Sequence, residues 1–406
     1  MTQPGFDPSG RDRAPGSFPS PLAQPSLTPP APIDPAQVSP APLQATPPAR
    51  SGRSGPIWIG AILVLLLIAL VGYFLTFLGT GASLLGAILA FIPLAGVLLA
   101  IRLIDRWEPE PRGLVAFALA WGAIASVIIA LGVDLVLSMV FGARDSYAAE
   151  VFQTVVQAPI VEEFAKGLGV LIVYAIGRRA FDGPVDGIVY GALVGAGFAF
   201  TENIQYFAVS WIEGGVGEAS TTFFVRGIMS PFAHVMFTSV TGFALGLAAR
   251  RGATTRQAVG PWLVGLAGAI LLHAFWNGSA MFTDFFSVYL VLQVPLFVLF
   301  VLGIVALRRE ESRLTRTRLG EYAAAGWFTP QEVDMLATPA GRKAGLRWAR
   351  GLQGDRTPIM KQFITDATAL AMARQRARTG RDPQAGAEEQ ALLAKTAAER
   401  QALLSL

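Results

Sequence analysis

Apolar residues dominate eight long runs between residues 57 and 307, and each run is long enough to cross a lipid bilayer as a helix. One crossing needs about 20 residues, because the hydrocarbon core is about 30 Å thick and a helix rises about 1.5 Å per residue. The sequence therefore predicts an all-α fold, a polytopic membrane helical bundle of about eight transmembrane helices. The predicted spans are Ile57–Leu78, Leu84–Leu103, Leu114–Phe141, Phe152–Ile176, Val185–Val209, Thr222–Ala249, Pro261–Ala280 and Phe286–Leu307.

The two ends of the chain differ from this apolar middle. Residues 1–55 are rich in Pro, Ser, Ala and Gln and poor in large apolar side chains, which is typical of a disordered tail. After the last run the composition turns polar, and Thr329-Pro330 and Thr338-Pro339 are N-cap and N1 signals of short helices. We therefore predict a disordered Pro-rich cytoplasmic tail (1–55), a transmembrane domain (56–308) and a small helical cytoplasmic tail (309–406).

Arginines flank the apolar runs at alternate ends, and this bias predicts the orientation. Arg and Lys accumulate in cytoplasmic loops, so both termini are expected in the cytoplasm of a multi-pass protein of the cell membrane. The intervening loops are short and carry a single arginine, Arg144. The flanking residues are Arg50, Arg53, Arg102, Arg106, Arg112, Arg178, Arg179, Arg250, Arg251, Arg256, Arg308, Arg309 and Arg313.

Composition supports this class and excludes others. With 53% hydrophobic and 15% charged residues and a mean hydropathy of +0.50, the chain is too apolar for a soluble globular protein. The net charge is +4, but the basic residues flank apolar runs, so they indicate topology and a lipid bilayer as partner rather than nucleic acid. The chain has no cysteine, which excludes disulfides, thiolate metal sites and a cysteine nucleophile.

The fourth predicted span carries three charged residues in five positions: Glu162, Glu163 and Lys166. Each charge at the centre of a membrane helix costs roughly 2.5–3.5 kcal/mol on insertion scales, so other helices must enclose this one. Lys166 can pair with either carboxylate, at i,i+4 or i,i+3. A plain structural ion pair would use one carboxylate and leave the second for proton transfer or metal binding, and Pro159 is expected to bend the helix one turn earlier.

Three more spans place polar groups at a similar depth: Glu202 in the fifth, His234 in the sixth, and His273 with Asn277 in the seventh. Each of these residues, taken alone, can be explained as a structural hydrogen bond between two helices. Four helices converging at one depth instead predict one internal site. Arg226 is either a counter-ion for Glu202 or a cation reaching for the membrane surface.

Two chemistries fit these groups. His234, His273 and a carboxylate, Glu163, would suit a divalent metal, most plausibly Zn²⁺ with a bound water, leaving another glutamate as general base. Without a metal, a glutamate would activate water while His and Asn donate hydrogen bonds to the developing oxyanion. The residues leave both routes open, as well as the choice of Glu162 or Glu163 as base. The predicted catalytic residues are Glu162, Glu163, Glu202 and Asn277.

Several ordered motifs between about Arg102 and Asn277 carry a resemblance to a known family. They are Asp105 to Pro111 (DRWEPEP), Ala158-Pro159 before Glu162-Glu163-x-x-Lys166, Asp182 to Tyr190 (DGPVDGIVY), Phe198 to Asn203, His234-x-x-Phe237 and His273-x-x-Trp276-Asn277. Together they resemble the PrsW family of intramembrane proteases, in the wider clan that includes the CAAX prenyl proteases. The resemblance implies an endopeptidase that acts on membrane-protein substrates. It also implies catalytic roles for Glu162, Glu163, Glu202, His234, His273 and Asn277.

Two other function classes compete with this interpretation. A proton-coupled secondary transporter also places carboxylates and histidines in membrane helices, although no inverted repeat is evident. A catalytically silent scaffold of the same fold would tolerate loss of single polar residues, whereas this chain has the full set. Zincin and serine-hydrolase chemistries fit poorly, because neither H-E-x-x-H nor G-x-S-x-G occurs.

The depth of the site follows from helix rise applied to the predicted spans. At about 1.5 Å per residue, Glu202 and His273 lie roughly 10 Å below the outer boundary, and Glu162 and His234 roughly 15–18 Å below it. We therefore expect peptide bonds to be cut toward the extracytoplasmic half of the membrane.

The predicted topology can be tested directly. A reporter fused after Leu307 should be active only in the cytoplasm, because the arginine bias places that end inside. Activity outside the cytoplasm would show that a span was miscounted and would remove the basis of the depth estimate.

Overall fold

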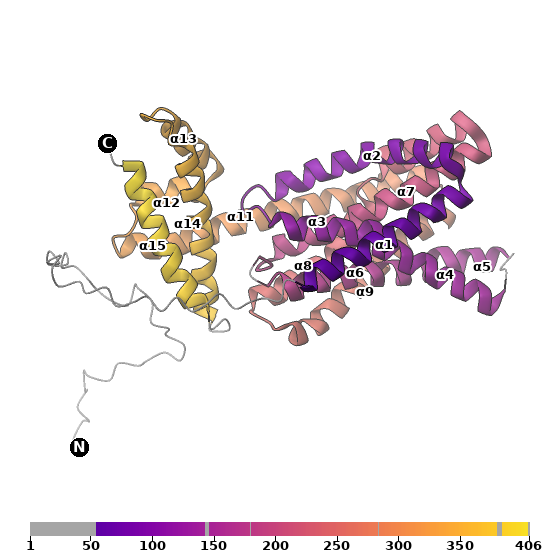
Figure 1. The fold of residues 1–406 in the computed structure, drawn as a ribbon, viewed down its shortest axis with the longest axis horizontal. Coiled ribbons are helices and arrows are strands. Elements are labelled where there is room, and N and C mark those ends of the chain that lie inside the picture. The colour runs from indigo at the N-terminus through magenta and orange to yellow at the C-terminus, as the bar shows by residue number, and fades with distance from the viewer. Residues whose placement is uncertain (1–53, 143–145, 179, 283, 380–383, 405–406) are drawn as a thin grey trace, which may run out of the picture. The chain divides into compact units, whose positions relative to one another are not determined.

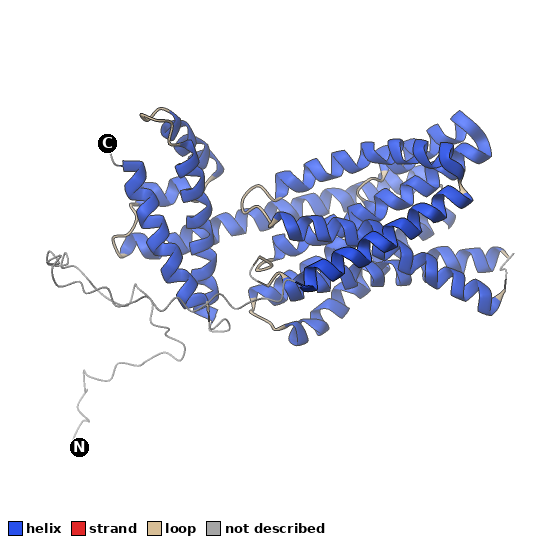
Figure 2. Cartoon of the chain, in the orientation of Figure 1, coloured by secondary structure: helices blue, strands red, loops and turns tan. Residues whose placement is uncertain are grey.

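The computed structural model describes residues 54–142, 146–178, 180–282, 284–379 and 384–404. Within these residues it contains helices and turns and no strand (Figure 2), so the predicted all-α membrane bundle is confirmed. The proposed disordered tail, 1–55, lies almost wholly outside the described part of the chain.

The described residues form two compact units that divide at Arg308 and Arg309. The assignment of residues 1–55, 56–308 and 309–406 to separate domains stays a prediction. In the first unit the long helices run side by side (Figure 1). Its elements are α1 (Ser54–Phe77), α2 (Gly79–Ile104), α3 (Arg112–Ala120), η2 (Trp121–Ser126), α4 (Val127–Phe141), α5 (Tyr147–Phe152), η3 (Gln153–Gln157), α6 (Ala158–Ile176), α7 (Pro184–Phe223), η4 (Phe224–Met229), α8 (Ala233–Arg250), α9 (Thr255–Phe282), α10 (Phe285–Val288), η5 (Tyr289–Gln293) and the first part of α11 (Val294–Ala324).

Six stretches of the described residues are long and apolar enough to cross a membrane. Eight spans were predicted, and the difference has two sources. The stretch Pro184–Arg250 joins two predicted spans, and α6 is too polar to count by composition because it carries Glu162, Glu163 and Lys166. The six stretches are Trp58–Phe77, Gly79–Ile104, Arg112–Phe141, Pro184–Arg250, Thr255–Met281 and Phe285–Ala324.

The long stretch Pro184–Arg250 folds back on itself at Gly215, where φ is +59°, a backbone conformation that favours glycine. Ring contact between Phe207 and Phe223, at 5.6 Å, shows that the two arms run antiparallel. The chain then leaves helical geometry around Ser230, just before α8 begins. The sixth predicted span, Thr222–Ala249, is therefore a broken helix.

Glycines on α7 bring α8 into close contact with it. Gly187, Gly191 and Gly195 are spaced four residues apart, and a Cβ at Gly195 would collide with the backbone of His234. Small residues at this spacing allow membrane helices to approach until their backbones touch. This contact places His234 against the same helix that carries Glu202.

Four π-helical segments interrupt the spans: η2, η3, η4 and η5. In η3 the amide N–H of Ala158 donates to the carbonyl of Gln153, five residues back. Regular α-helix begins again at Ala158, and Pro159, which has no N–H to donate, lies in the first turn of α6, where a proline is tolerated. Such π turns occur frequently at functional sites, and η3 and η4 both lie next to predicted site residues.

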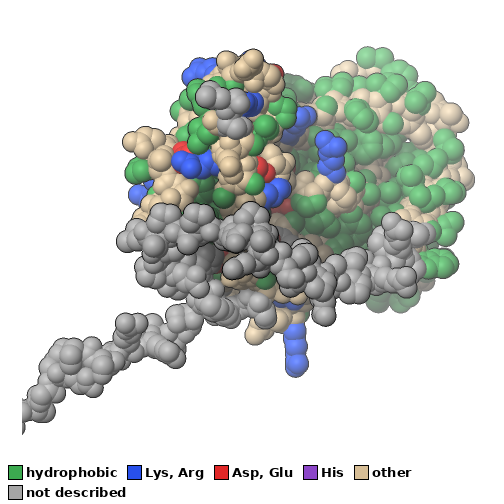
Figure 3. Space-filling model, turned by 60° about the vertical axis from the view of Figure 1, so that its left-hand side comes forward, with side chains coloured by type: hydrophobic (Ala, Val, Ile, Leu, Met, Phe, Trp, Pro, Cys, Tyr) green, Lys and Arg blue, Asp and Glu red, His purple; other side chains and the backbone are tan. Residues whose placement is uncertain are grey.

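The second unit contains the end of α11 with α12 (Pro330–Leu336), α13 (Pro339–Arg350), α14 (Thr357–Thr379) and α15 (Ala385–Leu404). The predicted helix starts are confirmed, because the hydroxyls of Thr329 and Thr338 cap α12 and α13. On the face that Figure 3 shows, charged side chains gather on these helices, whereas apolar side chains cover the transmembrane unit. That difference is expected of a water-exposed and a lipid-exposed surface respectively.

Three carboxyl groups, those of Asp105, Glu110 and Asp186, lie where the loop between α2 and α3 contacts the start of α7. The Tyr190 hydroxyl donates to Glu110 at 2.6 Å, and the Glu110 amide donates to Asp105 at 3.2 Å. Asp186 accepts from the amide of Gly183 at 2.7 Å. Burial raises the pKa of Glu110 from 4.5 to about 8, and burial likewise raises the pKa of Asp105 to about 6. Glu110 is therefore largely protonated at neutral pH.

The raised pKa of Glu110 predicts a loss of stability with rising pH. Between pH 4.5 and about 8 the unfolded chain binds fewer protons than the folded chain, so the free energy of unfolding falls as pH rises. Glu110→Gln keeps an acceptor for Tyr190 but cannot ionise, so its melting temperature should fall less steeply over this range. The measurement is thermal unfolding in detergent at several pH values. Glu150→Gln, at an exposed carboxylate, is the control and should follow the wild type. Parallel curves for wild type and Glu110→Gln would contradict the assignment.

Candidate active site

Lys166 lies at the centre of the polar groups that α6 brings into the bundle. Its ammonium is fully buried, 2.7 Å from Glu163 and 3.4 Å from Glu162. It also lies 3.1 Å from Nδ1 of His234 and 4.0 Å from the centre of the Phe198 ring. One buried cation thus contacts both carboxylates of α6 and one imidazole of α8.

Glu163 is fully enclosed by hydrogen-bond donors. Besides Lys166, the Thr238 hydroxyl donates to it at 3.0 Å, and Nδ1 of His273 lies 3.0 Å from its other oxygen. The side chain has no solvent exposure. Its oxygens are therefore occupied by donors from α6, α8 and α9.

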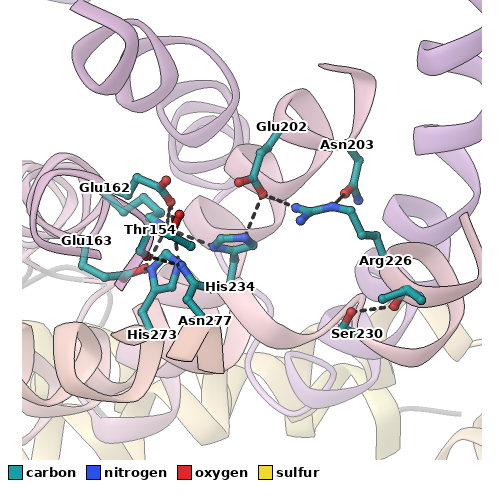
Figure 4. A network of polar contacts seen from close by, with 12 residues as sticks. Thr154, Glu162, Glu163, Glu202, Asn203, Arg226, Ser230, His234, His273 and Asn277 are labelled. Carbon is teal, nitrogen blue, oxygen red and sulfur yellow. Dashed lines mark hydrogen bonds and ion pairs between the residues drawn. The ribbon is translucent and has the colours of Figure 1, made fainter. Parts of the chain in front are cut away.

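His273 has one ring nitrogen held and one available. Because Nδ1 donates to Glu163, Nε2 keeps its lone pair, and this atom lies 4.0 Å from an oxygen of Glu162 (Figure 4). The Phe237 ring stacks on the imidazole at 4.9 Å and fixes its plane. A histidine whose far nitrogen donates to a carboxylate is the usual form of a metal-bound histidine.

His234 bridges Lys166 and Glu202. Lys166 donates to Nδ1, so Nε2 must carry the proton that is donated to Glu202, at 2.9 Å. The ring lies 5.1 Å from that of His273, nearly perpendicular to it. His234 is the second residue of α8, immediately after the break in the sixth predicted span.

Glu202 forms an ion pair with Arg226, which also donates through Nε to Asn203 at 2.8 Å (Figure 4). The guanidinium lies 3.8 Å from the centre of the Tyr206 ring. Of the two roles predicted for Arg226, the structure shows the counter-ion of Glu202.

Asn277 lies one helical turn beyond His273 on α9. Its side-chain amide donates to the carbonyl of Thr154 in η3 at 2.9 Å, which ties α9 to the π-helical segment before α6. This amide is therefore directed at the protein backbone in the structure, and not at the two imidazoles.

Three donor atoms, one each from Glu162, His234 and His273, lie within 4.8 Å of one another. Glu163 was predicted to join the two histidines, but in the structure Glu162 lies with them, and Glu163 contacts His273 at the opposite ring nitrogen, Nδ1. In a tetrahedral zinc site with Zn–N bonds of about 2.0–2.1 Å, the ligand atoms lie about 3.3 Å apart. The distances between the three donor atoms would therefore have to shorten by no more than about 1.5 Å for them to bind one ion. The residues fit a zinc ion once His234 releases one of its two present contacts.

Two cavities of about 380 Å³ each meet at Glu162 and Glu202. We call the one between α4, α6 and α7 the acidic cavity, because Asp134, Glu162 and Glu202 line it. The other, the histidine cavity, lies between η3, α8 and α9. It is lined by His234, His273, Asn277 and Arg226 among others.

Several polar residues of this region were not predicted from the sequence. Asp134 lies in the middle of an apolar helix, and the rule that ionisable residues in membrane helices mark function would have found it. It accepts hydrogen bonds from the amides of Gln153, at 3.0 Å, and Gln157, at 3.1 Å. Thr238 gave no signal, because a threonine in a membrane helix is common.

Comparison with known proteins gives a family likeness over the same region. Residues 110–301 match the family described as PrsW family intramembrane metalloprotease. Protease PrsW of Geobacillus kaustophilus is 30% identical over 144 residues, 36% of this chain and 58% of that protein. Protease PrsW of Clostridioides difficile is 34% identical over 161 residues, 38% and 63% respectively, and that of Bacillus subtilis is 27% identical over 144 residues, 36% and 60%. The chain thus spans about three fifths of the length of these relatives. No solved structure shows a significant match.

Proposed function

Because residues 110–301 are similar to the PrsW family, as the motifs predicted, we propose that the chain is an intramembrane endopeptidase that hydrolyses peptide bonds of membrane-protein substrates. One observation carries the proposal beyond the likeness. Glu162, Glu202, His234 and His273 come from four different helices and meet where two cavities join. Such a convergence of costly groups inside apolar helices is expected of a reaction centre.

We assign the metal site to Glu162, His234 and His273. Zn²⁺ bound there would supply a Lewis acid and a water of lowered pKa. Glu163 holds the ring of His273 in place through Nδ1 and fixes its tautomer. Asn277 keeps η3, and with it Glu162, in register with His273.

Glu202 is our choice for the general base. It lines both cavities, and Arg226 compensates its charge, so a carboxylate is available where water and substrate can both arrive. Once protonated by the attacking water, Glu202 can pass that proton to the leaving amine, while His234 keeps its carboxyl group in position through a hydrogen bond. The Arg226 side chain lines the histidine cavity, where it can stabilise the developing negative charge.

Access of water supports cleavage in the outer half of the membrane. The helix break around Ser230 lines the histidine cavity, and non-helical backbone at membrane depth is tolerated where it faces a water-filled space. From the two histidines, the cavity lining extends along η3 and along α9 to Met281. These are the helix ends that the arginine bias assigns to the extracytoplasmic side, with both termini in the cytoplasm.

The opposite side of the site argues against a transporter. Below Glu163 and Lys166 the bundle is filled by buried apolar residues, among them Val170, Val173 and Leu245. Alternating access needs a polar path toward each side in turn. Among the residues that the structure describes, the polar lining runs to one side, which favours hydrolysis over transport.

The two neighbouring glutamates should fail in different ways when each is changed to Gln. Glu162→Gln removes a metal ligand at a partly exposed position, so the protein should stay folded and lose at least about 100-fold in proteolysis. Glu163→Gln leaves the buried Lys166 with a weaker partner. Breaking a buried ion pair destabilises a protein by about 3–5 kcal/mol, so the melting temperature of this variant should fall as well. Both are measured on reconstituted protein with a set of single-span substrates, by mass spectrometry and thermal unfolding. Wild-type proteolysis in both variants would overturn the site assignment.

Metal content separates the two chemistries. Protein purified without chelators should carry about one equivalent of zinc by elemental analysis, because the three donors form one site. His273→Ala should lose it, whereas Asn277→Ala, at a neighbouring residue outside the donor group, should keep it. Full proteolysis by metal-free protein would instead support the route in which a glutamate alone activates water.

A further inference from the structure

The acidic cavity has an unbalanced charge. As far as the chain is described, its lining contains three carboxylates, Asp134, Glu162 and Glu202, and no Lys or Arg. Arg226 pairs with Glu202, and Lys166 lies 3.4 Å from Glu162 but is also the buried partner of Glu163; both cations lie outside the lining. Among the described residues no Lys or Arg pairs with Asp134, whose partners are two neutral amides. The negative charge of the lining therefore exceeds the positive charge that the described residues bring to it.

The rest of the lining suits a peptide that has left its helix. Val127, Leu131, Val161 and Val209 supply apolar surface, and Gln153, Gln157 and Gln205 add amide groups. An unwound segment in a membrane exposes backbone N–H and C=O groups that need partners, and a side-chain amide offers both donors and an acceptor. Such a lining can form hydrogen bonds with the backbone of an extended chain, which cannot satisfy these groups internally as a helix does.

The position of Asp134 fixes its distance from the reaction centre. Its carboxylate is held between Gln153 and Gln157, which precede Glu162 by nine and five residues on a nearly continuous helix. At about 1.5 Å per residue this is roughly 8–13 Å along the axis, and an extended peptide covers that distance in about two to four residues at about 3.3 Å each. The charge thus lies within reach of a side chain close to the scissile bond.

We propose that the acidic cavity binds the unwound substrate segment and that Asp134 selects a Lys or Arg side chain two to four residues from the scissile bond, on its extracytoplasmic side. The inference rests on the proposed protease function and adds a specificity determinant to it. Gln153 and Gln157 position the carboxylate. A substrate cation there would give Asp134 the ionic partner that no described Lys or Arg provides.

The test uses the fact that the chain has no cysteine. Val209→Cys places a single thiol in the lining of the acidic cavity, in a Glu162→Gln background that stops cleavage. The probe is a synthetic single-span peptide with a central Gly-Pro break and Lys, Gln or Glu three residues to its extracytoplasmic side. Protection is the slowing of thiol modification by neutral methyl methanethiosulfonate in proteoliposomes.

The Lys peptide should slow modification at least fivefold more than the Gln peptide, and the Glu peptide least of all. Asp134→Asn keeps an acceptor for both glutamines but removes the charge, so the difference should vanish; Asp134→Glu should restore it. Glu213→Gln removes an exposed carboxylate outside both cavities and should leave the difference unchanged. Equal protection by the three peptides, or a Lys preference that persists in Asp134→Asn, would overturn the inference.

Failure here is separable from failure of the proposed function. Cleavage of single-span substrates by wild-type protein without any preference for a nearby basic residue would overturn the role of Asp134 alone. A charge-dependent protection in a protein that cleaves none of them would support the binding site and overturn the protease assignment.

Discussion

The buried ion pair of Lys166 and Glu163 is the interaction on which the rest of the transmembrane unit depends. Neither side chain has solvent exposure, so each charge must be matched inside the bundle. The match comes from other helices, because α8 supplies Thr238 and α9 supplies His273. The indole of Trp262 also donates to the carbonyl of Gly167 at 2.8 Å. Three helices are thereby fixed in depth and rotation around this ion pair.

That fixation explains why the reactive groups need little further support. Once α6 is held, the position of Glu162 follows, because it is the adjacent residue and faces the cavities instead of the core. The close contact at Gly195 then sets the distance between α7 and α8, on which the bridge from Glu202 to His234 depends. A larger residue at that glycine would separate the two helices. The geometry of the site thus depends on close packing of α7 against α8 at a position that has no side chain, Gly195.

Much of the fold and of the candidate site could be predicted from the sequence, and the features that could not be predicted have physical reasons. Apolar runs, loop arginines and the polar residues inside the spans predict the fold class and the members of the cluster, and the likeness to the PrsW family is confirmed over residues 110–301. The sequence could not assign Glu162 and Glu163, because both have a favourable spacing to Lys166 and only the rotation of α6 against α8 and α9 tells them apart. The break near Ser230 was not predicted, although Pro231 disfavours helical geometry at the residue before it and marks the place in the sequence. Asp134 could have been predicted as an ionisable residue inside an apolar helix, but it was overlooked because the apolar run around it is long.

The direction in which the polar lining extends is independent of the loop charges. The site is closed on one side by apolar packing around Val170 and Leu245 and open on the other through η3, η4 and the end of α9. The arginine bias concerns residues outside the bundle, whereas this asymmetry concerns side chains within it, and neither requires the other. The polar lining extends to the helix ends that the arginine bias predicts on the extracytoplasmic side. A reversed topology would place the only polar route to the reaction centre within the described residues on the side with the arginine-rich loops, and the proposed cut would then lie in the cytoplasmic half.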